Sequence, residues 1–400
     1  MLTVVSVAEA IKMLRERFAG LVPAAEELPL DMCAGRICAS DIVCEEDIPP
    51  FSRSVMDGYA VRSADTAGAG ESIPSVLTVK GEVFMGEGTT LSLAPGECVR
   101  IPTGGVMPFL ADAVVPVEYT DEEQDCCLIY KSVGLYENVN RQGDDVPAGR
   151  TVIRKGTELD YTRIAVLAAM GKSRVRVYKR PSVGIISTGD ELIPIDETVP
   201  AGCIRDVNSH LLSAMCSSYG CTPVLYGIVR DDKAEFEKVL RRAAAECDAV
   251  LVSGGSSAGV RDMTAEMIAS NGEVLIHGLA MKPGKPTIAG AVDGKPVFGL
   301  PGHPAACCFV TRTVVKEILS LLSGVQIYET VKSAVLAENI SSNHGREEYL
   351  CVRLEGDKAY PVYGKSGVIS QLSSSDGYIV IPRDTEGLPA GTQVGVHEFL

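Results

Sequence analysis

The apolar run Ala249-Val-Leu-Val252 and the segment Ser253-Gly-Gly-Ser-Ser-Ala-Gly259 that follows it decide the fold of this 400-residue chain. Four apolar residues in a row are typical of a strand buried on both faces, and a helix-like stretch comes after the glycines. At such a strand-to-helix turn the backbone N–H groups are unpaired, and the helix dipole adds partial positive charge. The stretch therefore predicts a parallel α/β sheet with a site for a phosphorylated small molecule.

Two more loops rich in glycine and proline follow. Lys282-Pro-Gly-Lys-Pro286 is a turn stiffened by proline that carries two lysines. Gly299-Leu-Pro-Gly-His-Pro304 comes after the apolar run Pro296-Val-Phe298 and opens a long helix. Because the lysines carry full positive charges and the helix start carries unpaired N–H donors, we expect these loops to share one anionic ligand.

The apolar pattern between residues 181 and 322 alternates between strand and helix. Such alternation predicts a doubly wound parallel sheet, whose ligands bind beyond the carboxyl ends of the strands. The strands are expected at Ser182–Ser187, Thr222–Val229 and Asp248–Val252, and the helices at Ser209–Tyr219, Lys233–Glu246 and Pro304–Leu322.

The rest of the chain is organised differently. Residues 51–145 hold short β-branched runs broken by glycine or proline, which predict a small β domain. After residue 328 short alternating runs indicate a β-barrel or sandwich. Helical patterns appear at residues 5–19, after Ser6 as N-cap, and at Thr162–Met170. We therefore expect a multidomain protein of the α/β plus β class.

The composition excludes several classes of function. A net charge of −15 argues against nonspecific binding to nucleic acid or anionic membranes, because both need a basic face. The N-terminus has no signal-peptide pattern and the apolar stretches are too short to span a membrane, so we expect a cytoplasmic protein. The 13 cysteines include no C-x-x-C pair. We interpret them as reduced side chains that pack as small hydrophobes, with a metal cluster as the weaker alternative.

Carboxylates follow the ends of several expected strands. Ser187-Thr-Gly-Asp-Glu-Leu192 ends the first strand, Asp231 and Asp232 end the second, and Asp262 follows the glycine-rich segment. Carboxylates at one sheet edge suit Mg²⁺, which binds oxygen ligands and substrate phosphates. Taken alone, Asp231 is more simply the N-cap of the helix that starts at Lys233.

Other catalytic patterns are missing. No G-x-S-x-G elbow accompanies the serines, the five histidines show no pairing, and His303 is interpreted as a packing or loop residue. Gly171-Lys-Ser173 resembles the end of a Walker A motif, but Val166 occupies the position of its first glycine. A nicotinamide fingerprint and zinc-ligand spacing are also absent from the sequence.

The segment Phe51–Arg62, taken alone, predicts only a β-turn at Asp57-Gly58. In combination with the other motifs it resembles the molybdopterin molybdenumtransferase family: the bacterial MoeA-type enzymes, their plant counterparts and the C-terminal part of gephyrin. The resemblance covers nearly the whole chain. Its segments are Met56–Arg62, Ile101–Gly105, Gly143–Asp145, Ser187–Leu192, Val229–Asp232, Ser253–Asp262, Lys282–Pro286, Leu300–Pro304, Gly345–Arg346 and Asp376–Pro382.

The resemblance implies an elongated homodimer with four domains per subunit. They are a split linker and dimerisation domain (residues 1–48 and 146–180), a small β domain (49–145), a molybdopterin-binding α/β domain (181–326) and a C-terminal β-barrel (327–400). The active site would lie between the α/β domain of one subunit and the β domain of the other.

The resemblance also implies a reaction and its partners. Adenylylated molybdopterin and molybdate are the substrates, AMP is released, molybdenum stays on the dithiolene sulfurs, and Mg²⁺ assists. The molybdopterin adenylyltransferase and the molybdoenzymes that receive the cofactor would be protein partners.

The roles of individual residues follow from the same resemblance. The residues expected to bind pterin and phosphates are Ser253, Gly254, Gly255, Gly259, Pro301, Gly302 and Pro304, with Lys282 and Lys285 offsetting the pyrophosphate charge. Glu191, Asp231 and Asp262 would hold Mg²⁺ and act in catalysis, together with Asp57 from across the dimer cleft. Thr103, Arg346 and Ser366 match substrate or oxyanion contacts.

One position departs from the family pattern. An arginine usually stands three residues before the Gly-x-Asp turn, where this chain has Asn140, with Arg141 one place later. Either Arg141 takes over the role or a neutral amide replaces a charge that attracts molybdate. A paralogue that prefers tungstate is therefore one alternative. The others are a nucleotide pyrophosphatase or deamidase of the competence-damage type, and a non-enzymatic scaffold like gephyrin.

Overall fold

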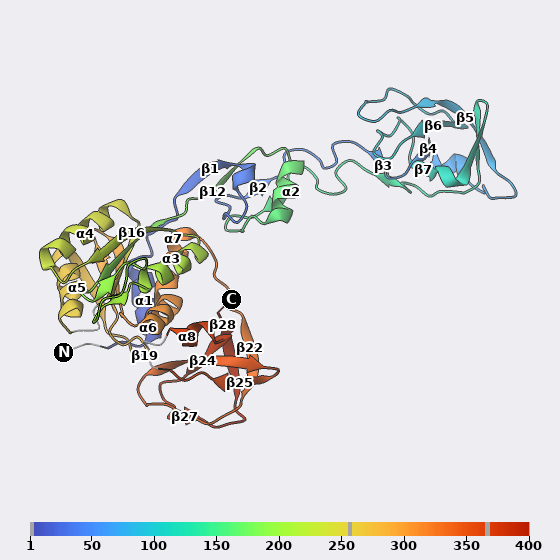
Figure 1. Cartoon of the computed structure of the whole chain (residues 1–400). Coiled ribbons are helices and arrows are strands. Elements are labelled where there is room, and N and C mark those ends of the chain that lie inside the picture. Colours follow the sequence, from blue (N-terminus) through green and yellow to red (C-terminus); the bar gives the residue numbers. More distant parts are fainter. Residues whose placement is uncertain (1–3, 255–257, 365–368, 400) are drawn as a thin grey trace. The chain divides into compact units, whose positions relative to one another are not determined.

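A computed structural model of the chain describes residues 4–254, 258–364 and 369–399, with the side chains of 258–262 left out of the description (Figure 1). The chain divides into two units, Met1–Glu26 with Val177–Leu400 and Glu27–Arg176. Each unit is described by itself.

The first unit contains a six-stranded, mostly parallel sheet. Its strands are, in spatial order, β16 (Thr222–Val229), β13 (Ser182–Thr188), β17 (Ala249–Gly254), β21 (Lys295–Leu300), β20 (Ile288–Val292) and β18 (Gly272–His277). The first four are parallel, as predicted, whereas β20 pairs in antiparallel fashion with both of its neighbours, β21 and β18. Asp293 and Gly294, both with positive φ, form the two-residue turn that reverses the chain between β20 and β21.

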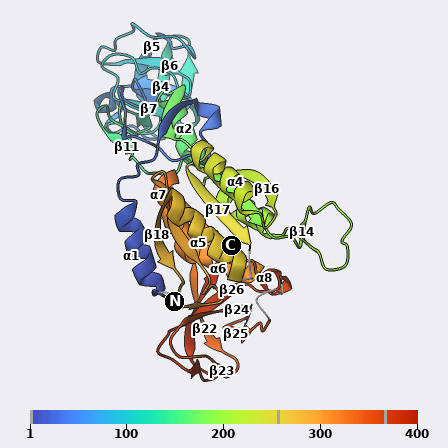
Figure 2. The same cartoon turned by 90° about the vertical axis from the view of Figure 1, so that its left-hand side faces the viewer.

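Helices cover both faces of this sheet (Figures 1 and 2). One face packs against α4 (Lys233–Glu246) and α5 (Ala258–Asn271), with Phe236 and Ile268 in its core. The opposite face packs against α1 (Val7–Arg17), α3 (Asn208–Ser218), α6 (Pro304–Val310) and α7 (Lys316–Ser323). The sheet is therefore doubly wound, as predicted.

Local sequence signals set several of the helix ends. Ser6 and Glu9 form a capping box at the start of α1. The N-cap of α4 is Asp232, whose side chain accepts a hydrogen bond from the Glu235 N–H, so the interpretation of Asp231 as the cap is wrong. The long helix expected at Pro304–Leu322 is interrupted by a π-helical turn at Thr311–Val315 between α6 and α7.

The C-terminal strands close into a barrel, which resolves the choice between barrel and sandwich. The five strands are β24 (Glu347–Glu355), β25 (Lys358–Pro361), β22 (Val331–Leu336), β28 (Gln393–Glu398) and β26 (Gly377–Ile381). Closure comes from β26, which pairs with both β28 and β24. The short strand β19 (Met281–Lys282) pairs in parallel with β24 and so joins the lysine-bearing turn to the barrel. The smaller elements of this unit are β14 (Leu192–Ile193), β15 (Ile204–Arg205), β23 (Ile340–Ser341), β27 (Gly387–Leu388) and α8 (Ser370–Ser373).

The second unit holds the small β domain predicted from the sequence. Its six-stranded sheet has the order β7 (Ala113–Pro116), β4 (Gly58–Val61), β6 (Glu97–Ile101), β5 (Ser75–Glu82), β9 (Cys126–Ile129) and β8 (Thr120–Glu123). The segments before and after this sheet pair with each other, as a split linker domain requires, but the four domain boundaries stay a prediction. The paired elements are β1 (Ala25–Pro29) with β12 (Arg174–Tyr178), β2 (Ile42–Val43) with β11 (Thr151–Ile153), and β3 (Arg53–Ser54) with β10 (Val139–Asn140). The helical elements are α2 (Tyr161–Ala169), η1 (Leu30–Met32), η2 (Ser63–Thr66) and η3 (Val117–Tyr119).

The cysteines behave as the sequence predicted. All 13 are free thiols, and all except Cys126 and Cys203 are buried. Among the described helices none is both long and apolar enough to cross a membrane.

A charged cluster attaches the barrel to the α/β part of the first unit. Glu329, which precedes β22, forms ion pairs with Lys316 on α7 and with His397 on β28. The His397 ring is stacked on Tyr378, with the ring centroids 5.0 Å apart. The hydrogen bond with His397, followed by that with Lys316, lowers the pKa of Glu329 from 4.5 to about 2.

We predict that Glu329→Gln lowers the melting temperature at pH 7, and that this deficit shrinks in acid. A carboxylate whose pKa is lowered by folding adds stability above its unfolded pKa, and loses it as the pH falls toward the folded value. The deficit should therefore begin to shrink near pH 4.5 and vanish toward pH 2. Thermal scans from pH 7 downward test this, with the exposed Glu338→Gln as control. A deficit that stays constant between pH 5 and pH 3 would contradict the prediction.

Candidate functional site

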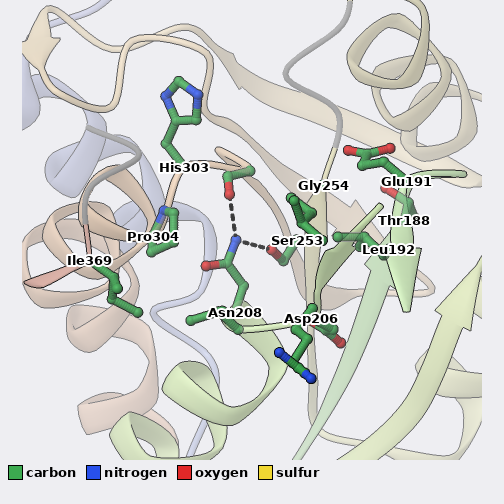
Figure 3. A pocket seen from close by; sticks show the side chains of 14 residues that line it. Thr188, Glu191, Leu192, Asp206, Asn208, Ser253, Gly254, His303, Pro304 and Ile369 are labelled. Atoms are coloured by element: carbon green, nitrogen blue, oxygen red, sulfur yellow. Dashed lines mark hydrogen bonds between the residues drawn. The ribbon is translucent and has the colours of Figure 1, made fainter. Parts of the chain in front are cut away.

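The carboxyl ends of the parallel strands surround a cavity of about 470 Å³ (Figure 3). Thr188 comes from the end of β13, Ser253 and Gly254 from the end of β17, and Gly302 from the loop after β21. The predicted site residues that line it are Glu191, Ser253, Gly254, Gly302 and Pro304. The volume lies within the range of small-molecule sites, and the position is the one expected for an open α/β sheet.

A close backbone contact shapes one wall of this cavity. Gly254 has a φ of +150°, and a Cβ atom there would lie 2.1 Å from both the carbonyl oxygen and Oγ1 of Thr188. Only glycine fits, because any side chain would push β17 and β13 apart at the point where both strands end. The glycine at the start of the glycine-rich segment is thus needed for the approach of the two strands.

Asn208, the first residue of α3, joins the end of β17 to the loop after β21 (Figure 3). Its Nδ2 donates one hydrogen bond to Ser253 Oγ at 2.7 Å and another to the Gly302 carbonyl oxygen at 2.9 Å. The sequence analysis missed this residue. A signal was available, since Asn208 stands beside Asp206 just before an apolar helix face, but a lone asparagine there is equally typical of helix capping.

Three carboxylates lie near one another beside the cavity. Burial, followed by the charges of Asp190 and Glu191, raises the pKa of Asp231. The Asp231 N–H donates to Asp190 Oδ1 at 3.2 Å. Gly189, in the turn after β13, has a φ of +147°, which favours glycine, and the Glu191 carboxylate folds back over it. Asp190 was part of the predicted motif but was not assigned a role.

The predicted Mg²⁺ ligand set is therefore only partly visible. The structure brings Glu191 and Asp231 into electrostatic contact, while the side chain of Asp262, on α5, lies outside the described residues. In the described part of the chain no three His, Cys, Asp or Glu side chains are grouped as metal ligands. The ligand set stays a prediction.

Lys282 lines a second cavity of about 450 Å³, which shares His303 with the first. Its Nζ lies 2.8 Å from Glu348 Oε1, its neighbour across the β19–β24 pairing. Glu348 is 13% exposed in its side chain and also accepts a hydrogen bond from Ser342 Oγ at 2.6 Å. The charge of Lys282 is therefore already balanced, whereas the sequence analysis expected it to be available for a pyrophosphate.

For the remaining predicted site residues of this unit, the structure gives only their position in the chain and their burial. Lys285 is half-buried on the same turn as Lys282, Pro301 is buried at the start of its loop, and Arg346 is exposed just before β24. Gly259 belongs to α5. Gly255 and Ser366 lie outside the described residues.

In the second unit the structure brings Asp57 and Thr103 together beside a cavity of about 310 Å³ lined by Asp57. Asp57 Oδ1 accepts hydrogen bonds from the Thr103 backbone N–H at 2.7 Å and from Thr103 Oγ1 at 2.9 Å. These two bonds, the backbone one first, lower the pKa of Asp57. Asp57 is thus an exposed carboxylate that is held in its charged form.

Arg141 is engaged by its own turn. Its guanidinium Nη2 lies 2.9 Å from Asp144 Oδ1, and its Cζ lies 4.7 Å from the centre of the Tyr136 ring. Asn140 belongs to β10, where it pairs with Arg53 of β3. The charge of Arg141 is balanced by Asp144 and Asn140 is neutral, so neither residue supplies a free positive charge.

Comparison with known proteins gives the family. The MoeA N-terminal region (domain I and II) matches residues 5–171, a probable molybdopterin binding domain matches 184–320, and the MoeA C-terminal region (domain IV) matches 333–399. A molybdopterin molybdenumtransferase of Staphylococcus epidermidis is 32% identical over 401 residues, which cover 98% of this chain and 95% of that protein. The chain belongs to the MoeA family of molybdopterin molybdenumtransferases.

Other relatives agree with this assignment to the MoeA family. A putative molybdopterin biosynthesis protein of Methanocaldococcus jannaschii is 36% identical over 380 residues, covering 93% of this chain and 92% of that protein. The crystal structure of a molybdopterin biosynthesis MoeA protein from Pyrococcus horikoshii matches with a TM-score of 0.91 at 37% identity and covers 100% of both chains. The chain is therefore an enzyme with the MoeA fold along its whole length.

We predict that Thr103→Val raises the pKa of Asp57 in this MoeA enzyme. The substitution removes the hydroxyl donor but keeps the backbone donor, so the pKa should move part of the way toward its ordinary value. Carboxyl carbon chemical shifts followed from pH 2 to pH 6 measure it. Thr120→Val, which removes a hydroxyl that donates to the Val117 carbonyl oxygen, is the matched control. An unchanged Asp57 titration would show that the hydroxyl bond does not form in solution.

We also predict that Glu348→Gln strengthens the binding of inorganic pyrophosphate. The substitution removes the negative charge that faces Lys282. Because an ion pair that is partly exposed contributes little free energy, its loss should raise the affinity for pyrophosphate roughly two- to fivefold. Isothermal titration calorimetry at constant ionic strength measures it. Glu355→Gln, which removes an equal charge at the other end of β24, is the control and should have a smaller effect. Equal effects of the two variants would mean that only the net charge of the protein matters.

Proposed function

We propose that this chain inserts molybdenum into molybdopterin, with adenylylated molybdopterin and molybdate as substrates and AMP as a product. Membership of the MoeA family supports the general chemistry. The observation that carries the specific reaction is the cavity at the sheet edge, where the ends of β13 and β17 and the loop after β21 meet. A ligand with a ring and phosphates suits a cavity that combines apolar walls with unpaired backbone donors.

The energetic demand of the reaction is modest. The phosphoanhydride of an adenylylated substrate is already activated, so the protein mainly has to position the anion and offset its charge. Backbone N–H groups of the glycine-rich segment and of the loop after β21 would supply donors without adding net charge. Lys285 and Arg346 add positive charge, while Lys282 contributes only after its ion pair with Glu348 opens.

Mg²⁺ fits the acidic side of the cavity. Glu191 and Asp231 would hold it, with Asp262 completing the set, because the carboxylates that raise the pKa of Asp231 would be stabilised by a cation. When bound, Mg²⁺ offsets the negative charge of the phosphates.

The proposal also includes a homodimer. Asp57 of one subunit would act on the substrate held by the other. Its charged carboxylate would position Mg²⁺ or molybdate, or transfer a proton. The hydrogen bonds from Thr103 favour this charged form.

The central test is a metal-insertion assay. The purified protein is incubated with adenylylated molybdopterin and Mg²⁺, with molybdate, tungstate or neither, and both AMP release and protein-bound metal are measured. We expect molybdate to be retained in step with AMP release. Stronger retention of tungstate would indicate a tungstate-preferring paralogue, and AMP release with neither metal retained would support a plain pyrophosphatase instead.

We predict that Asp57→Asn abolishes molybdenum retention while the circular dichroism spectrum stays unchanged. The amide keeps the size of the side chain and an oxygen that accepts from Thr103, but it loses the negative charge. The control is Asp125→Asn, an exposed residue on the turn between β8 and β9 of the same sheet. Full metal retention by Asp57→Asn would remove Asp57 from the reaction, and a changed spectrum would assign it a structural role.

A further inference from the structure

Asn208 has an acceptor that no residue in the described part of the chain satisfies. The residue is 7% exposed, and both hydrogens of its amide are used in bonds to Ser253 Oγ and the Gly302 carbonyl oxygen. Its Oδ1 has no hydrogen-bond partner within the part of the chain that the structure describes. A buried acceptor of this kind costs free energy and needs an explanation.

The orientation of Oδ1 is fixed by the two bonds that Nδ2 makes. Because Nδ2 must face Ser253 and Gly302, the amide oxygen faces away from both, toward the side of the cavity where Pro304 and Ile369 lie (Figure 3). The amide cannot be turned over without placing its oxygen against the Gly302 carbonyl oxygen. The assignment of donor and acceptor is therefore settled by the neighbours.

A second residue of the same cavity also has an unpartnered polar atom in the described part of the chain. Thr188, at the end of β13, is 1% exposed, and its Oγ1 also has no partner in the described ranges. The cavity is also lined by apolar side chains, namely Leu192, Ile204, Val207, Pro304 and Ile369. Apolar walls with a few fixed polar atoms are typical of a site for a flat heteroaromatic ring.

We infer that Asn208 is a specificity-determining residue, whose Oδ1 accepts a hydrogen bond from the exocyclic amino group of a planar heterocycle in the cavity. The inference rests on the proposed function and deepens it. Through Nδ2 this side chain holds the end of β17 next to the loop after β21, and through Oδ1 it favours a ligand that offers a hydrogen-bond donor. Pterin and adenine both carry such an amino group, so either end of the proposed substrate supplies the chemistry.

The test compares ligands in which an oxo group replaces the exocyclic amino group. Calorimetry measures binding of 6-hydroxymethylpterin against 6-hydroxymethyllumazine, which has an oxygen in place of the amino group, and of AMP against IMP. The wild-type protein should prefer the amino-bearing member of at least one pair by about tenfold, the usual value of one buried hydrogen bond. The pair that is discriminated identifies the ring that Asn208 contacts.

Variants separate the two roles of Asn208. Asn208→Leu should reduce the preference to about onefold, because it removes Oδ1. Ser253→Ala removes one bond of Nδ2 and leaves Oδ1 in place, so it should weaken both members of a pair but keep their ratio. Asn271→Asp is the folding control, since that asparagine donates to the Met267 carbonyl oxygen at the far end of α5.

Each outcome of the binding measurements supports or overturns the role of Asn208. No preference in the wild-type protein, or a preference that survives Asn208→Leu, overturns the inference. If Asn208→Leu fails to fold, the wild-type preference and the constant ratio in Ser253→Ala still decide. The metal-insertion assay on the wild type separates the role of Asn208 from the proposed function. If the protein inserts metal but does not prefer the amino-bearing ligands, only the role of Asn208 is refuted. If it neither inserts metal nor binds the ligands, the proposed function is refuted as well.

Discussion

The contact between Gly254 and Thr188 is the constraint on which the binding edge depends. β13 and β17 run in register to their last residues, where Thr188 lies opposite Gly254. A Cβ atom at Gly254 would overlap the Thr188 backbone, so the two strands end together only because that side chain is missing. Beyond this contact, residues from the ends of both strands, from the loop after β21 and from the start of α3 line one cavity.

Binding an anion is a difficult task for a chain with a net charge of −15. Two of the candidate cations are already paired with carboxylates, so the proposed site would depend more on neutral donors. Lys282 is balanced by Glu348 and Arg141 by Asp144. Backbone N–H groups act at short range and add nothing to the long-range field, which makes them suitable donors beside the carboxylates of Asp190, Glu191 and Asp231.

Sequence reasoning succeeded where the signal is local. The bounds of β16 and α4 follow directly from the apolar pattern, and the capping box at Ser6 marks the start of α1. It failed where two local signals compete. Asp231 and Asp232 are both possible caps of α4, and only the hydrogen bond to Glu235 shows that Asp232 is the cap. The π-helical turn at Thr311–Val315 has no glycine or proline to mark it.

The sequence by itself determined the alternating α/β class, the family, and five of the residues that line the cavity at the sheet edge, because these depend on short patterns along the chain. Only the tertiary structure decided what each side chain does there. Lys282 meets Glu348, Asp57 meets Thr103, and Asn208 links Ser253 to Gly302 through contacts between residues 45 to 94 positions apart. The pairing of β26 with β24, which closes the barrel, likewise joins segments that are separated along the chain. Such pairings arise from packing of distant segments, which no local pattern of apolar and polar residues encodes.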